Sequence, residues 1–184
     1  IVPNTIYGFT DFYYLPNFIE VGKGYWVYSS DDGYITLTTD TTQYLSKSIT
    51  FNDKTEQGNS LQFTNDNGHT INLYFGIKLN DTEKLSYTLP PLPPSGYDVR
   101  FSDNMRVVDD YGEIQIMDIS ETLTIAYDIK LNAGEHYNWV LTATSGKEYI
   151  LENAGELTVP SAERFTLELR AVVPATFTLH QNFP

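Results

Sequence analysis

The chain has 184 residues, a formal net charge of −13 and no cysteine. Its 24 acidic and 11 basic residues exclude a nucleic-acid-binding role, because phosphate contacts need clustered Lys and Arg, and the lack of Cys excludes disulfides and thiolate metal sites. A hydrophobic content of 41% with no apolar run of about 18 residues is typical of a folded protein without a membrane span.

The first candidate element is rich in aromatic residues. Gly22-Lys23-Gly24 is followed by Tyr25-Trp26-Val27-Tyr28. In an extended strand, Tyr25 and Val27 share one face, and Trp26 and Tyr28 share the other. Together with Trp139, the residues Tyr25, Trp26 and Tyr28 are candidates for an interface or a sugar-stacking platform. Packing into the core is the competing interpretation.

Period-two alternation predicts half-buried strands further along the chain. These strands cover residues 34–39 (Ile35 and Leu37 inward), 113–117 (Ile114 and Ile116), 122–127 (Leu123, Ile125 and Tyr127) and 164–170 (Phe165, Leu167 and Leu169). Hairpin-type breaks are expected at 31–33, 65–68, 109–112, 133–134 and 145–146. A single helical turn at most is expected around residues 80–84.

Short strands separated by turn residues are typical of an all-β protein. We therefore expect an antiparallel β-sandwich, Ig-like or jelly-roll-like, with two small β modules in tandem. Leu89-Pro90-Pro91-Leu92-Pro93-Pro94 cannot donate to a strand ladder and predicts a rigid crossover between two strands. A less favoured interpretation makes this segment a ligand for an aromatic-lined groove.

No motif for catalysis or cofactor binding occurs. Gly-x-Ser-x-Gly and Gly-x-Gly-x-x-Gly are absent, and no histidine has a second histidine at metal-ligand spacing. Calcium is the one ion with weak candidates, because carboxylates in loops suit it. These candidates are Asp31, Asp32, Asp66, Asp109 and Asp110. Solvated acidic turns are the competing interpretation, and we expect no catalytic residue and no cofactor.

Three segments together resemble a known family. They are Gly22-Lys23-Gly24-Tyr25-Trp26-Val27, the pair Leu73-Tyr74-Phe75-Gly76 and Tyr87-Thr88-Leu89-Pro90-Pro91-Leu92-Pro93-Pro94, and the stretch from Val173 to His180-Gln181-Asn182-Phe183-Pro184. These segments resemble the C-terminal β-sandwich region of type IX secretion cargo, which are surface proteins with a C-terminal sorting signal. The chain is similar to that region cut off before the sorting domain.

The resemblance implies a domain division and a location. Residues 1–44 would be the C-terminal part of a Gly-Lys-Gly-Tyr-Trp module whose fold another chain segment completes. Residues 45–178 would be a β-sandwich module, and residues 179–184 would start the linker to the sorting domain. Export across the outer membrane to the cell surface or beyond would follow, and no catalytic residues are implied.

The sequence therefore favours a non-catalytic extracellular module for adhesion, spacing or assembly into a surface fibre. Its partners would be sister modules of the parent chain or identical subunits, joined through β-strand edges. The alternative is a carbohydrate-binding accessory module, for which a polysaccharide would be the ligand. A glycosidase is a third possibility, which would need two carboxyl groups in one cleft.

Overall fold

A computed structural model describes residues 1–35, 51–117, 120–130, 137–161 and 164–172. The predicted turn at 133–134, the histidines His136 and His180, and the motif that ends at Pro184 lie outside the described residues. Of the strand predicted over 34–39, Tyr34 and Ile35 are described. Both are exposed and outside any strand, so the inward placement of Ile35 is wrong.

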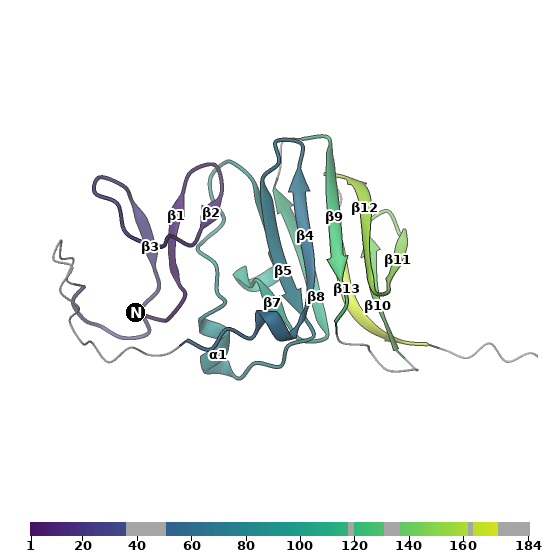
Figure 1. Ribbon diagram of the computed structural model, residues 1–184, viewed down its shortest axis with the longest axis horizontal. Helices are drawn as coiled ribbons and strands as arrows, with labels where there is room; N and C mark the ends of the chain where they lie inside the picture. The colour runs from purple at the N-terminus through teal and green to yellow at the C-terminus, as the bar shows by residue number, and fades with distance from the viewer. Residues whose placement is uncertain (36–50, 118–119, 131–136, 162–163, 173–184) are drawn as a thin grey trace, which may run out of the picture.

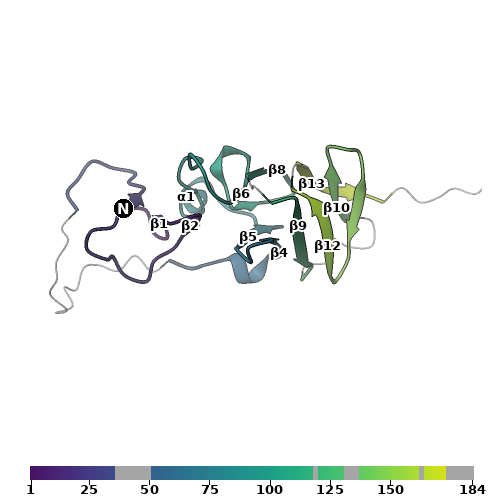
Figure 2. The same cartoon turned by 90° about the horizontal axis from the view of Figure 1, so that it is seen from above.

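The chain forms three sheets, and the predicted all-β sandwich class is confirmed. Figure 1 shows a small N-terminal sheet beside a larger sandwich, and Figure 2 shows the two layers of that sandwich. The N-terminal sheet has the order β2-β1-β3: β2 (Tyr13–Tyr14), β1 (Ile6–Phe9) and β3 (Tyr25–Val27). One sandwich layer has the order β11-β10-β13-β8-β6: β11 (Glu148–Leu151), β10 (Tyr137–Ala143), β13 (Phe165–Ala171), β8 (Tyr111–Met117) and β6 (Asp98–Phe101). The other has the order β12-β9-β4-β5-β7: β12 (Ala154–Pro160), β9 (Thr122–Asp128), β4 (Asn59–Asn65), β5 (Thr70–Phe75) and β7 (Val107–Val108).

The alternating segments become strands as predicted. Residues 113–117 lie in β8, residues 122–127 in β9, and the segment 164–170 gives β13. Ile114, Leu123 and Ile125 are buried, because every second side chain of these strands faces the space between the layers.

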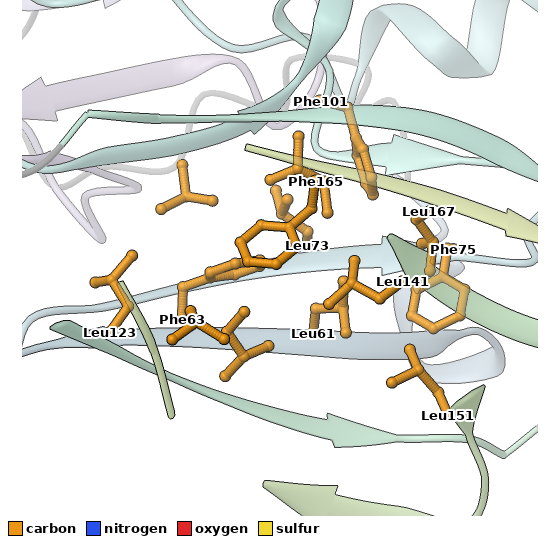
Figure 3. Close-up of a cluster of buried hydrophobic side chains, with 14 of the residues drawn as sticks. Leu61, Phe63, Leu73, Phe75, Phe101, Leu123, Leu141, Leu151, Phe165 and Leu167 are labelled. Atoms are coloured by element: carbon orange, nitrogen blue, oxygen red, sulfur yellow. The ribbon is translucent and has the colours of Figure 1, made fainter. Parts of the chain in front are cut away.

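The core lies between the two layers and is built from aromatic and branched side chains. Leu61 of β4 is paired with Leu73 of β5, and Leu141 of β10 with Leu167 of β13. Figure 3 shows Phe63, Phe101 and the other labelled side chains converging from both layers. Burial of such side chains is the main source of stability in a sandwich of this kind.

Of the hairpins predicted at 65–68, 109–112 and 145–146, two form and one does not, and the turn predicted at 31–33 is followed by no strand at Tyr34 and Ile35. Asn65-Asp66-Asn67-Gly68 joins β4 to β5, and Ser145-Gly146 lies between β10 and β11. The segment 109–112 is not a hairpin, because β7 and β8 belong to different layers and β8 already begins at Tyr111. The chain changes layers there.

The connection from β5 to β6 contains the predicted helical turn and the proline crossover. Helix α1 (Asp81–Leu85) begins with a capping box: Glu83 N donates to Asn80 Oδ1 (2.9 Å), and Asn80 N donates to Glu83 Oε2 (3.0 Å). A 3₁₀ turn at Thr55–Gln57 precedes β4, and another at Ser102–Asn104 joins β6 to β7. The long connection from β5 through α1 and β6 lets β7 pair in parallel with β5, because parallel neighbours cannot be joined by a short turn.

A buried ion pair anchors the proline crossover to β6. Arg100 is 1% exposed, and its Nε and Nη2 donate to the Oδ1 and Oδ2 atoms of Asp98 at 2.5 and 2.6 Å. Its Nη1 donates to the carbonyl oxygen of Pro90 (2.6 Å) and to Oδ1 of Asn104 (2.7 Å). The guanidinium therefore neutralises Asp98 and fixes the crossover in one place.

Candidate functional site

The N-terminal sheet docks on the sandwich where the crossover enters β6. Tyr97 N donates to the carbonyl oxygen of Asp11 (2.8 Å), and Tyr13 Oη donates to the carbonyl oxygen of Pro91 (3.1 Å). On the opposite layer, the ring of Phe12 lies 4.9 Å from the ring of His69. These contacts hold β1 and β2 beside β5 and β6, at one end of the sandwich (Figure 2).

A cleft of about 280 Å³ lies between the N-terminal sheet and this edge. Four tyrosines, one arginine and one aspartate contribute side chains to it: Tyr7, Tyr13, Tyr14, Tyr74, Arg106 and Asp98. We call it the tyrosine cleft. Thr70 and Asn72 of β5 also line it and add uncharged polar groups.

Glycine makes room for one wall of the tyrosine cleft. Gly8 of β1 is paired with Tyr14 of β2. A Cβ atom on Gly8 would lie 2.4 Å from the Tyr14 ring, so only glycine lets that ring lie across the strand. Tyr7 also packs edge-on against Tyr13, with ring centroids 6.3 Å apart.

Two hydrogen-bond donors in the tyrosine cleft lack an acceptor. Tyr7 is 3% exposed, and neither its hydroxyl nor the Nε of Arg106 has a hydrogen-bond partner among the described residues. Burial raises the pKa of Tyr7, while the nearby charges of Arg106 and Arg100 act in the opposite direction. The hydroxyl therefore keeps its proton at neutral pH and remains a donor.

Arg106 also has no carboxylate partner in the described part of the chain. Its guanidinium lies over the ring of Tyr87, 5.7 Å from the centroid, and no described Asp or Glu pairs with it. In a protein of net charge −13, an arginine without such a partner is unexpected. The nearest acidic group in the cleft, Asp98, already has both oxygens bound by Arg100.

A second groove holds the proline crossover against aromatic side chains of the N-terminal sheet. This groove of about 330 Å³ is lined by Trp26 and Tyr28 on one side and by Pro90 and Pro91 on the other. The predicted shared face of Trp26 and Tyr28 is thus found in the groove. The proline segment was predicted to be a crossover between two strands or, less favourably, a ligand for an aromatic-lined groove. It forms the crossover, and it also lines a groove with aromatic side chains of the same chain.

Most of the exposed large apolar side chains of the described residues also belong to the N-terminal segment. Among the described residues, ten exposed large hydrophobic side chains lie in residues 1–35 and five in the rest. Six of the ten form what we call the neutral apolar surface: Leu15, Phe18, Ile19, Val21, Trp26 and Tyr28. Between Phe12 and Ser30 the only charged residues are Glu20 and Lys23, which form an ion pair (2.9 Å), so this segment carries no net charge.

The outer faces of the sandwich are polar. The strand registers place Thr158, Thr124, Thr64 and Thr70 in one row across β12, β9, β4 and β5. The described aromatic side chains on the two outer faces are Tyr74 on one layer and Tyr111 on the other, so neither face has a row of rings.

The four residues predicted as interface candidates lie in different environments in the structure. Trp139 is 4% exposed and packs edge-on against Phe75 across the layers (4.7 Å between ring centroids), so it belongs to the core and not to a surface. Tyr25 is half-buried, and its hydroxyl accepts a hydrogen bond from Glu20 N (2.8 Å). Trp26 and Tyr28 are the two that reach the surface.

The calcium candidates do not converge. Asp31 and Asp32 lie in the segment that follows β3. Asp66 lies in the β4–β5 turn and accepts a hydrogen bond from Thr122 of β9. Asp109 and Asp110 use their backbone oxygens to accept from Gly76 and Leu169. In the described ranges, no three or more His, Cys, Asp or Glu side chains gather where they could hold a metal ion.

Comparison with known proteins identifies no relative of this chain. No protein-family model matches the chain, and neither the curated proteins nor the solved structures give a significant match. Among the described residues there is no helix with the length and apolar character to cross a membrane.

Sequence reasoning missed the tyrosine cleft. Tyr7 and Arg106 lie far apart in the sequence and meet only when β1 docks beside β5. The local sequence gives no signal for this site, because Arg106 has Asp103 and Asp109 three positions away on either side and looks like an arginine with acidic partners.

Proposed function

We propose that this chain is a non-catalytic contact module of a secreted surface protein, and that it associates with a second copy of itself through the neutral apolar surface. The observation that carries the proposal is the concentration of exposed apolar side chains there, with Val21 97% and Phe18 75% exposed. Exposed apolar side chains that are concentrated in one segment mark a contact site more often than single scattered ones do.

Charge favours a second copy as the partner. The whole chain carries a net charge of −13, so two copies repel each other over most of their surfaces. The segment between Phe12 and Ser30 carries no net charge, so two copies that approach through it meet less electrostatic repulsion than through an acidic surface. A two-fold contact buries the same patch on both subunits at once.

Strand edges provide a second element of the contact. Within the part of the chain that the structure describes, β3 and β2 of the N-terminal sheet each pair with one strand, β1. An edge strand next to exposed apolar side chains can add a strand from a neighbour. Adhesion, spacing or assembly into a surface fibre would follow from repeated contacts of this kind, and the resemblance to type IX secretion cargo supports a place outside the cell.

Sedimentation analysis over a range of concentrations tests the association. The wild-type chain is expected to self-associate, and the double variant Phe18→Ser, Val21→Ser to remain monomeric. Ile150→Ser is the matched control, because Ile150 is an exposed apolar side chain on β11, at the far end of the sandwich. A wild-type chain that stays monomeric at every concentration contradicts the proposal.

A further inference from the structure

We infer that the tyrosine cleft binds a carboxylated sugar, whose carboxylate is held by Arg106 and Tyr7. This inference stands apart from the proposed self-association, which is tested at Phe18 and Val21; of the six residues of the neutral apolar surface, Leu15 also lines the tyrosine cleft. It rests on a cleft, two donors without acceptors, and the rings around them.

The donors define the charge of the ligand. The Tyr7 hydroxyl and the Arg106 Nε are both shielded from solvent and both lack a partner among the described residues. A buried donor without a partner costs free energy, so such a pair points to an acceptor that binds there. One carboxylate can accept from both donors, and hydrogen bonds between charged groups are the strong ones.

The neighbouring charges do not oppose a carboxylate. Asp98 is the acidic side chain in the cleft lining, and Arg100 binds both of its oxygens. Its charge is therefore compensated inside the protein. Arg106 keeps its positive charge without an acidic partner among the described residues, so the local field at the cleft favours an anion although the protein as a whole is acidic.

The rings define the rest of the ligand. Tyr13, Tyr14 and Tyr74 line the cleft together with the polar side chains of Thr70 and Asn72. Tyrosine rings offer an apolar face to the C–H face of a sugar ring, and their hydroxyls offer a polar rim. Amide and hydroxyl side chains can bond sugar hydroxyls.

The size of the cleft limits the ligand to a small unit. A volume of about 280 Å³ is just below the roughly 300–1,000 Å³ common for small-molecule sites. The cleft therefore accommodates about one sugar ring, either as a free uronic acid or as one residue of an acidic polysaccharide. Both sources share the same carboxylate and ring chemistry.

Calorimetric titration distinguishes a free uronic acid from an acidic polysaccharide as the ligand. Glucuronate and an oligogalacturonate are the two acidic probes, glucose is the neutral probe, and a tetraglutamate peptide tests the acidic-peptide alternative. The titrations use about 0.15 M salt, so that the overall charge of −13 does not mask binding. The wild-type chain is expected to bind glucuronate or oligogalacturonate and not glucose; binding of the oligomer alone identifies a polysaccharide as the source.

Variants assign the binding to the cleft. Arg106→Gln is expected to weaken binding of the acidic sugar by about tenfold to a hundredfold, the loss of a charged hydrogen bond. Tyr7→Phe removes only the unpartnered hydroxyl and leaves the ring, so it keeps the test informative if Arg106→Gln does not fold; we expect a several-fold loss. Arg164→Gln is the control for charge, because Arg164 is exposed and lies outside the cleft.

Three results of the sugar titrations would overturn the inference, and one result of the peptide titration would do so as well. They are no binding of either acidic sugar, equal binding of glucose, and unchanged affinity in both Arg106→Gln and Tyr7→Phe. Tighter binding of the peptide than of the oligogalacturonate would also overturn it, in favour of an acidic peptide as the ligand.

Discussion

Gly96 lies against the backbone of Asp11 so closely that no side chain fits between them. A Cβ atom on Gly96 would lie 2.1 Å from the carbonyl oxygen of Asp11, and the same oxygen accepts a hydrogen bond from Tyr97 N at 2.8 Å. Gly96 also has a φ of +102°, which side chains rarely adopt. This close approach is one of the contacts that join the N-terminal sheet to the sandwich and so form the tyrosine cleft.

Gly96→Ala is expected to detach the N-terminal sheet from the sandwich. The positive φ costs about 1–2 kcal/mol for alanine, and the clash with backbone adds to it. Hydrogen exchange of the β1 amides measures the effect, and faster exchange is expected in the variant. Gly146→Ala is the matched control, because Gly146 has a φ of +86° and nothing within 4 Å of its Cβ position. Equal exchange of β1 in both variants would contradict the docking.

Asp98→Asn is expected to destabilise the protein by about 3–5 kcal/mol, because it leaves the guanidinium of Arg100 buried without its carboxylate. Urea unfolding measures the free energy of unfolding. Glu148→Gln is the control: it removes a carboxylate from an exposed ion pair with Arg170, where a loss of about 0–1 kcal/mol is expected. Similar losses in the two variants would show that the Asp98–Arg100 pair is not the anchor described above.

The stabilising effect of Glu83 is expected to depend on pH. The side chain of Lys54 and the backbone N–H of Asn80 lower the pKa of Glu83 below its ordinary value. The carboxylate therefore stabilises the fold above its unfolded-state pKa, and this contribution is lost as the pH falls through the lower folded-state pKa.

Melting temperatures of the wild type and Glu83→Gln check this between about pH 7 and pH 3. The difference between the two proteins should be present at neutral pH and shrink towards the acidic end. Glu152→Gln, at an exposed carboxylate between β11 and β12, controls for loss of one negative charge. A difference that stays constant over this pH range would argue against a role for the charged form.

The two tryptophans are expected to behave differently. Trp139→Ala should cost about 3–5 kcal/mol, because it opens a cavity in the core beside Phe75. Trp26, 50% exposed, should account for the part of the fluorescence that acrylamide quenches readily. Quenching of Trp26→Phe and Trp139→Phe variants assigns each signal, and a strongly quenched Trp139 would place it outside the core.

The strands were predictable where the information is local. In β8, β9 and β13 the alternation alone identifies the buried face, because each strand has one face in the core. In β10 the three consecutive residues Trp139, Val140 and Leu141 are all buried, so alternation alone does not identify the core position of Trp139.

The site was not predictable because it depends on contacts between distant segments. Asp98 and Arg100 alternate like outward polar residues of an edge strand, and only the proline crossover above them makes them buried. Likewise the segment 109–112 has the composition of a hairpin turn, but the register of β8 with β13 directs the chain into the other layer. Nothing in the local sequence specifies that choice.

Oxidative cross-linking tests the self-contact most directly, because the chain has no cysteine of its own. Asn17→Cys places one thiol next to Phe18 in the neutral apolar surface, and Glu152→Cys places one at the opposite end of the molecule. Rapid formation of a disulfide-linked dimer by Asn17→Cys and slow formation by Glu152→Cys is the expected result. Equal rates for the two variants would mean that the copies meet without preference for this surface, which contradicts the account.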